Sequence, residues 1–73
     1  MRYTIVIEKS PQNYAAYVPD LPGCVATGTS EAEVIDEIRE AIQLHIESLR
    51  EHHEPVPEPR STAAVVDVLA VAR

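Results

Sequence analysis

The sequence predicts a single α+β domain over residues 1–73, in the order β-β-β-α-β, with a four-stranded mixed sheet and one long helix on one face. Three observations lead to this fold. Three short β-rich runs separated by turn residues come first. An amphipathic pattern then runs from about Glu31 to about His52. A proline-rich connection over residues 54–63 leads to an apolar run, Ala64–Val71, which a right-handed crossover would return to the sheet.

The length of the chain and its net charge exclude several classes of function. A chain of 73 residues is near the lower limit for a self-sufficient core, and one cysteine excludes an internal disulfide, so we expect oligomerisation as reinforcement. The net charge of -6 and six scattered basic residues disfavour nucleic acid and anionic membranes as direct partners but suit a basic protein. No apolar run approaches the ~18 residues of a membrane span, and no signal peptide precedes the first strand pattern, which indicates a cytoplasmic protein.

The three predicted N-terminal strands are residues 2–8, 14–18 and 23–27. They are rich in β-branched and aromatic residues, and tight turns between them favour an antiparallel meander. Alternation puts two sets of side chains of the first strand on opposite faces of the sheet. The two sets are Tyr3, Ile5 and Ile7, and Thr4, Val6 and Glu8.

The turn between the second and third strands is a candidate partner contact. Its sequence, P-D-L-P-G, combines two prolines with a glycine that tolerates positive φ. A structural role is the simpler interpretation, but recognition residues are often found on rigidly held loops. The candidate residues are Asp20, Leu21, Pro22 and Gly23.

The predicted helix begins with a capping box, because Ser30 and Glu33 have the S-x-x-E spacing. At 100° per residue an apolar stripe lies within an arc of about 80°. The stripe is Ile35, Ile38, Ile42, Ile46 and Leu49. Acidic residues occupy the opposite arc, with Leu44 in its middle, either as an ordinary exposed leucine or as an anchor for a partner. The candidate partner-binding residues here are Glu37, Glu40, Leu44 and Glu47.

The predicted fourth strand is apolar on both faces apart from Asp67, which is typical of a strand covered on both sides. We expect Val66, Val68 and Ala70 to face the helix, because this keeps Asp67 out of the core. One helix covers only one face of the sheet, so a second copy of the chain is the simplest cover for the other face. The expected oligomer face is Thr4, Val6, Val65 and Leu69.

The residues do not favour catalysis, a metal or a cofactor. Two-metal nuclease chemistry needs several carboxylates converging at strand ends, and the fourth strand offers only Asp67. His45, His52 and His53 lack metal-ligand spacing and suit the C-terminal end of a helix. Cys24 has no cationic neighbour in sequence that would favour a thiolate, so it is expected to be a small buried hydrophobe.

Several segments together resemble the HicB-like antitoxin family: Y-T-I-V-I-E, A-Y-V-P-D-L-P-G-C, G-T-S-E-A-E, I-R-E-A-I and E-P-V-P-E-P. The resemblance covers about residues 3–59. It implies a partial ribonuclease H-like fold, which agrees with the topology expected above. It also implies a role in a type II toxin–antitoxin system, in which the antitoxin neutralises HicA, a small basic mRNA-cleaving toxin.

Many members of that family carry a C-terminal helix-turn-helix or ribbon-helix-helix segment that binds operator DNA. Here the sequence reaches Arg73 just after the fourth predicted strand, so we expect a short form without direct nucleic-acid binding. Two functions follow as expectations. The first is a protein-binding antitoxin domain, and the alternative is a stand-alone structural or regulatory oligomer with no toxin partner.

Overall fold

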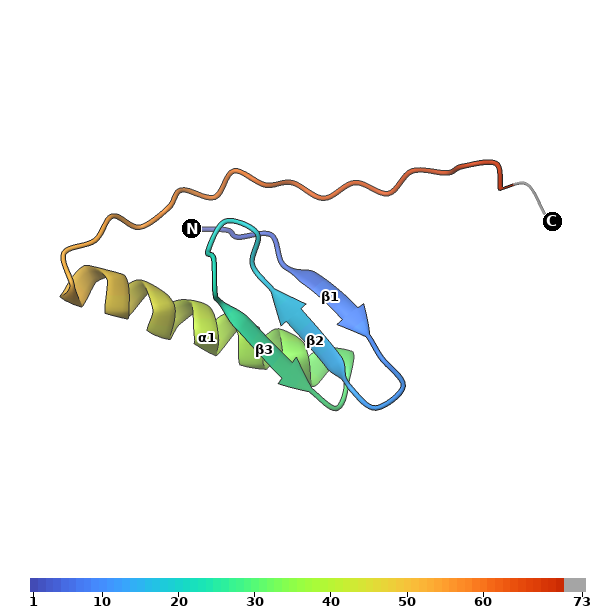
Figure 1. Cartoon of the computed structure of the whole chain (residues 1–73), viewed down its shortest axis with the longest axis horizontal. Coiled ribbons are helices and arrows are strands. Elements are labelled where there is room, and N and C mark those ends of the chain that lie inside the picture. Colours follow the sequence, from blue (N-terminus) through green and yellow to red (C-terminus); the bar gives the residue numbers. More distant parts are fainter. Residues whose placement is uncertain (71–73) are drawn as a thin grey trace.

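The computed structural model describes residues 1–70 and contains a three-stranded antiparallel sheet with one long helix across it (Figure 1). The strands are β1 (Val6–Lys9), β2 (Tyr14–Tyr17) and β3 (Val25–Gly28), in that order in the sheet. The helix α1 (Glu31–Glu51) follows. The α+β class, the N-terminal meander and the helix are therefore confirmed.

The helix starts at the predicted capping box. Ser30 is the N-cap, and its hydroxyl oxygen accepts a hydrogen bond from the Glu33 N–H at 3.1 Å. The Glu33 carboxylate reaches back one residue further than in the standard box, to Thr29, and accepts bonds from its N–H and its hydroxyl, both at 3.0 Å. These contacts satisfy backbone donors that have no partner within the helix, which fixes the point where the chain leaves β3.

At its other end α1 stops in a Schellman motif. The Glu54 N–H donates to the Leu49 carbonyl at 2.8 Å and the His53 N–H to the Arg50 carbonyl at 3.1 Å. His53 adopts the left-handed conformation that this motif requires, with φ of 56°. The chain therefore turns back sharply after the helix, toward the N-terminal residues (Figure 1).

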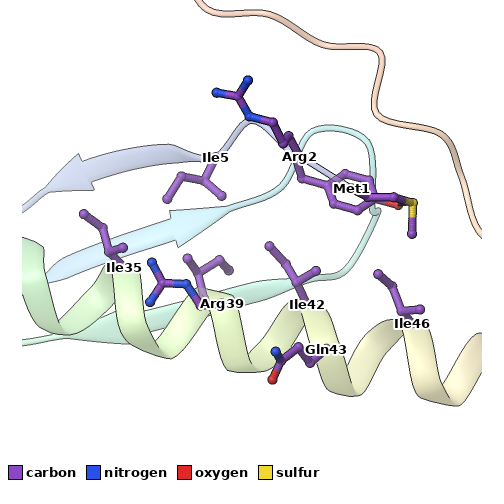
Figure 2. Close-up of a pocket in the computed structure, with 10 residues that line it drawn as sticks. Met1, Arg2, Ile5, Ile35, Arg39, Ile42, Gln43 and Ile46 are labelled. Atoms are coloured by element: carbon purple, nitrogen blue, oxygen red, sulfur yellow. Dashed lines mark hydrogen bonds between the residues drawn. The ribbon is translucent and has the colours of Figure 1, made fainter.

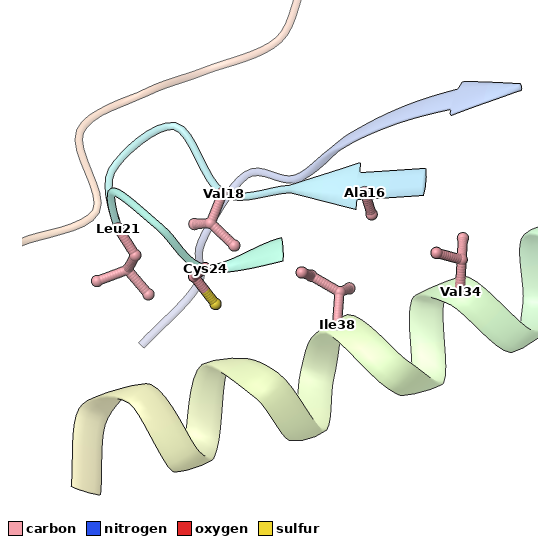
Figure 3. Packing of buried hydrophobic residues seen from close by; sticks show 6 residues of the cluster. All are labelled: Ala16, Val18, Leu21, Cys24, Val34 and Ile38. Atoms are coloured by element: carbon pink, nitrogen blue, oxygen red, sulfur yellow. The ribbon is translucent and has the colours of Figure 1, made fainter. Parts of the chain in front are cut away.

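The core lies between the sheet and one side of α1 (Figure 3). Its buried residues are Ala16, Val18, Leu21, Cys24, Val34 and Ile38. Tyr3, Ile5 and Ile7 pack against this cluster, as their alternation predicts. The helix packs mainly on β3 and β2 and only weakly on β1. For that reason Val34 is fully buried, although it flanks the predicted stripe, whereas Ile35 and Ile46 are only half-buried.

The prediction of a fourth strand is wrong for the described residues, 64–70. Residues 64–70 are extended but pair with no other strand, and Val65 and Leu69 are 98% and 95% exposed. Val66, Val68 and Ala70 are exposed as well and do not face the helix. Within one chain this segment leaves the sheet instead of following its edge (Figure 1). The last residue of the prediction, Val71, lies outside the described part of the chain.

The physical reason lies in the connection before it. Prolines at positions 55, 57 and 59 have no N–H, so this stretch cannot begin a ladder of hydrogen bonds with β1. Side chains hold it instead. The Tyr3 hydroxyl donates to the Pro57 carbonyl at 2.6 Å, and the Thr4 hydroxyl donates to the Ser61 carbonyl at 2.7 Å.

The strongest attachment of the connection is made by Asp20. One carboxylate oxygen accepts hydrogen bonds from the N–H groups of Arg60 and Ser61, both at 2.9 Å, and the other accepts from the Ser61 hydroxyl at 2.8 Å. The Ser61 N–H, and then the Arg60 N–H, hold the pKa of the Asp20 carboxyl below its usual value. We call this contact between Asp20 and residues 60–61 the anchor.

Gly28 allows the last residue of β3 to approach the first turn of α1. A Cβ atom at this position would lie 2.8 Å from the Val34 backbone nitrogen. Real side chains do not tolerate that distance, and backbone atoms cannot move aside as a flexible side chain would. The helix can therefore lie directly against β3 only because residue 28 has no side chain.

Gly28→Ala is expected to destabilise the fold by about 1–3 kcal/mol, because the new methyl group overlaps the helix backbone. Thr27→Ala, at the exposed neighbouring position, is the matched control and should change stability by no more than about 0.5 kcal/mol. Urea unfolding followed by circular dichroism measures both. Equal stability of the two variants would contradict the close approach.

The anchor is expected to depend on pH. Because the pKa of Asp20 is lowered on folding, the stabilisation is complete above the ordinary carboxyl pKa of about 3.9 and is lost as the pH falls through the lower, folded value.

Asp20→Ala should raise the hydrogen-exchange rate of the Arg60 and Ser61 amides by roughly tenfold at neutral pH. NMR amide exchange measures this, with Glu58→Ala on the same connection as control. Unchanged exchange at Ser61 in Asp20→Ala would contradict the anchor.

Candidate functional site

A shallow hollow with acidic walls lies between β3 and α1, with a cavity volume of about 330 Å³. The sequence analysis selected three of its residues, Glu37, Glu40 and Leu44, and the structure places all three beside β3. Its lining is completed by Val25, Ala26, Thr27 and Ala41. Two large apolar side chains are exposed here, Leu44 at 59% and Val25 at 65%.

We define the acidic surface as Glu37, Glu40, Leu44 and Glu47. These four helical residues are spaced three or four positions apart, so they follow one line along α1. Within residues 1–70 the ion pair that the structure shows joins Arg39 to Asp36, at 2.9 Å, and involves none of these carboxylates. The acidic surface therefore combines uncompensated negative charge with one exposed hydrophobic contact, Leu44, which suits a basic protein.

Val25 is exposed at the rim of the hollow, but its side chain does not belong to this surface. Val25 follows the buried Cys24 and precedes the half-buried Ala26, so alternation directs its side chain to the face of the sheet away from α1. What the sequence could not show is that β3 is an edge strand beside α1, which brings this strand close to Leu44.

The turn residues are arranged differently. The Asp20 carboxylate is engaged in the anchor, and the Leu21 side chain is a core residue with 0% exposure. Pro22 and Gly23 are exposed, and Gly23 has φ of +84°, which explains a glycine at that place in the turn. None of the four lines the hollow, so the structure does not join them to the acidic surface.

A second opening lies on the β1 side of the helix (Figure 2). It is a groove of about 520 Å³ between the N-terminal residues and α1. Five isoleucines line it, namely Ile5, Ile35, Ile38, Ile42 and Ile46, and the lining also includes Met1 and Tyr3. Two arginines belong to its lining, Arg2 from the N-terminal residues and Arg39 from α1. The sequence analysis missed this groove because it treated the isoleucines of α1 as one apolar stripe.

The titratable groups offer little for catalysis. Cys24 is buried, and burial raises the pKa of its thiol, which disfavours the thiolate that a nucleophile requires. Across residues 1–70 no three His, Cys, Asp or Glu side chains come together in a group that could hold a metal ion. Asp67 is on the exposed C-terminal segment, whereas Asp20 is occupied in the anchor. In the same part of the chain, no helix combines the length and the apolar character needed to cross a membrane.

Sequence comparison finds relatives over nearly the whole chain. Residues 3–71 match the family model described as the HicB_like antitoxin of bacterial toxin-antitoxin system. A UPF0150 protein of Thermoplasma acidophilum is 39% identical over 67 residues, which span 90% of this chain and 97% of the relative. A UPF0150 protein of Synechocystis is 46% identical over 57 residues, 77% of this chain and 72% of the relative.

Structural comparison agrees with the sequence. A chain of the solved structure titled "HicA3 and HicB3 toxin-antitoxin complex" superposes with a TM-score of 0.72 and 33% identity, and the match covers 82% of this chain and 70% of that one. The resemblance noted from the sequence motifs is therefore confirmed both by the family model and by the fold. The protein belongs to the HicB-like antitoxin family of bacterial toxin–antitoxin systems.

Proposed function

We propose that this protein binds and neutralises a small basic HicA-like toxin, and that the acidic surface is where the toxin docks. Membership of the antitoxin family supports the role. The observation that carries the choice of surface is that Leu44 is exposed beside Glu37 and Glu40, around one hollow.

The physical chemistry of such a contact is favourable. The carboxylates attract a positively charged toxin over a distance of about a Debye length and raise the rate of encounter, mainly at low salt. Leu44 then supplies apolar area, which slows dissociation once water is expelled from the hollow. A basic enzyme that binds RNA needs its positive face free, so an acidic protein seated on that face would block RNA access.

The turn at residues 20–23 is a less suitable docking site for the toxin than the acidic surface. Asp20 already satisfies three donors of the connection, and removing it for a partner would release the anchor. Leu21 cannot reach a partner from the core. Only Pro22 and Gly23 present free surface there, a smaller area than the hollow provides.

In this proposal the protein acts by occlusion and performs no reaction of its own. Membership of an antitoxin family indicates a non-catalytic role. An mRNA-cleaving toxin acts in the cytoplasm, so the antitoxin would work there too. The alternative function, a stand-alone oligomer without a toxin, requires no basic partner at all.

The test uses the purified 73-residue chain and a small, Lys/Arg-rich HicA-type toxin from the same genome. The wild-type chain is expected to stop RNA cleavage by that protein at low ionic strength. Glu37→Gln/Glu40→Gln should slow association about tenfold and flatten its salt dependence, since steering depends on these charges. Leu44→Ala should weaken the complex by about 1–2 kcal/mol, mainly through faster dissociation. Surface plasmon resonance separates the two rates.

The matched control is Glu8→Gln/Glu54→Gln, which removes two exposed carboxylates that lie outside the acidic surface. It should leave association almost unchanged. A loss of binding in Pro22→Ala with full binding in Leu44→Ala would move the site to the turn. Failure of the wild-type chain to inhibit the toxin at low salt would overturn the function itself and favour the stand-alone oligomer.

A further inference from the structure

The C-terminal segment, residues 62–70, is exposed although its composition is that of a buried strand. Val65 and Leu69 are almost fully exposed, and Val66 and Val68 are 75% and 79% exposed. The segment contains no proline or glycine, and three of its nine residues are valine, which favours extended pairing. It lacks only a strand to pair with.

The sheet offers a free place on the side where this segment passes. The strand β1 pairs with β2 along one edge and has no partner along the other. The groove with Ile5, Ile35, Ile42 and Ile46 opens on the same side, because α1 packs on β2 and β3 and leaves β1 less covered (Figure 2). An unpaired edge beside an apolar groove is a template for one more strand.

On the face of the sheet away from α1, an apolar row of side chains crosses the three strands and ends at the unpaired edge of β1. Val6, Tyr17 and Val25 are opposite one another across the three strands. Tyr17 and Val25 are exposed, and Val6 is half-buried. A strand added to β1 would extend this row with every second side chain and fill the groove with the rest. A segment that is apolar on both faces, as residues 62–70 are, fits such a position.

The chain's own segment starts near this edge and then leaves it. The anchor and the Thr4–Ser61 hydrogen bond hold residues 60–61 beside the N-terminal residues. From there the segment extends away from the sheet (Figure 1). Nine residues at about 3.3 Å each span roughly 30 Å, which is enough to reach along the β1 edge of another molecule. Because two identical copies each have a free edge and a free segment, a two-fold arrangement satisfies both.

Charge favours a second copy over a basic partner in this groove. Arg2 and Arg39 are both part of its lining. Arg39 is paired with Asp36, so Arg2 supplies the positive charge that would repel a positively charged toxin there. The one charged residue between Thr62 and Ala70 is Asp67, which is complementary to Arg2. The acidic surface for the toxin, in contrast, lies on the β3 side of the helix.

We propose that residues 62–70 of each chain add as a strand to the free edge of β1 in a second copy and cover its groove, so that the protein is a dimer built by strand exchange. This inference does not depend on the proposed function, since it requires no toxin. It also explains why the predicted fourth strand is missing from the single chain. The strand forms, but in the partner's sheet.

The test measures the oligomeric state of the full-length chain by sedimentation equilibrium. We expect a species of twice the 8.1 kDa chain mass at micromolar concentration. Val65→Asp/Leu69→Asp should weaken the dimer at least about 100-fold, because two charges would replace apolar side chains in the interface. Ile46→Asp, from the groove side, should act in the same direction, with circular dichroism to verify that the helix is intact.

Leu44→Asp is the matched control, because it places the same charge on an exposed leucine outside the proposed interface. It should change the dimer affinity by less than about threefold. Hydrogen exchange gives a second readout, since the amides of residues 64–70 should be protected in the dimer and exchange freely on dilution. A monomer at all concentrations, a dimer that survives Val65→Asp/Leu69→Asp, or tail protection that is independent of concentration would each overturn strand exchange.

Discussion

The structure depends on how one helix is seated on a small sheet. Gly28 and the Ser30 cap bring α1 directly against β3, so the helix packs over β3 and β2 and its contact with β1 is weak. A chain of this size cannot cover more with a single helix. Consequently, the well-packed core is confined to one side, and an apolar groove remains open on the other. The asymmetric position of α1 therefore determines where both the acidic surface and the apolar groove lie.

The anchor determines what the C-terminal part of the chain can do. Asp20 accepts hydrogen bonds from two N–H groups and a hydroxyl of residues 60–61. The P-D-L-P-G turn therefore attaches the proline-rich connection to the sheet. The turn thus has a structural task that accounts for Asp20 and for the buried Leu21. The two proposals therefore assign recognition to surfaces on either side of α1, one acidic and one apolar with arginines in its lining.

Local rules predicted most of the fold from the sequence. Alternation in the first strand, the S-x-x-E cap and the helical period depend on neighbouring residues, and the structure agrees with each of them. The fourth strand failed because strand formation also requires a partner, and hydrophobicity alone does not say which molecule supplies it. The anchor could not be predicted either, since it joins Asp20 to residues about forty positions away.

The candidate site was predictable only in part. The helical period placed Glu37, Glu40 and Leu44 on one face, and the structure adds that β3 lies beside them. The groove was not predicted from the sequence, because the isoleucines of the helical stripe were expected to pack in the core. They are lining residues because the helix is displaced toward β3, a fact of packing that no local pattern encodes.

The central claim is that this small protein has two separate docking surfaces, one for a basic toxin and one for its own copy. Native mass spectrometry of the chain co-expressed with a small basic HicA-type toxin tests both at once. The account predicts an assembly that contains this chain in pairs together with the toxin. A single 8.1 kDa chain that neither pairs nor retains the toxin would contradict it.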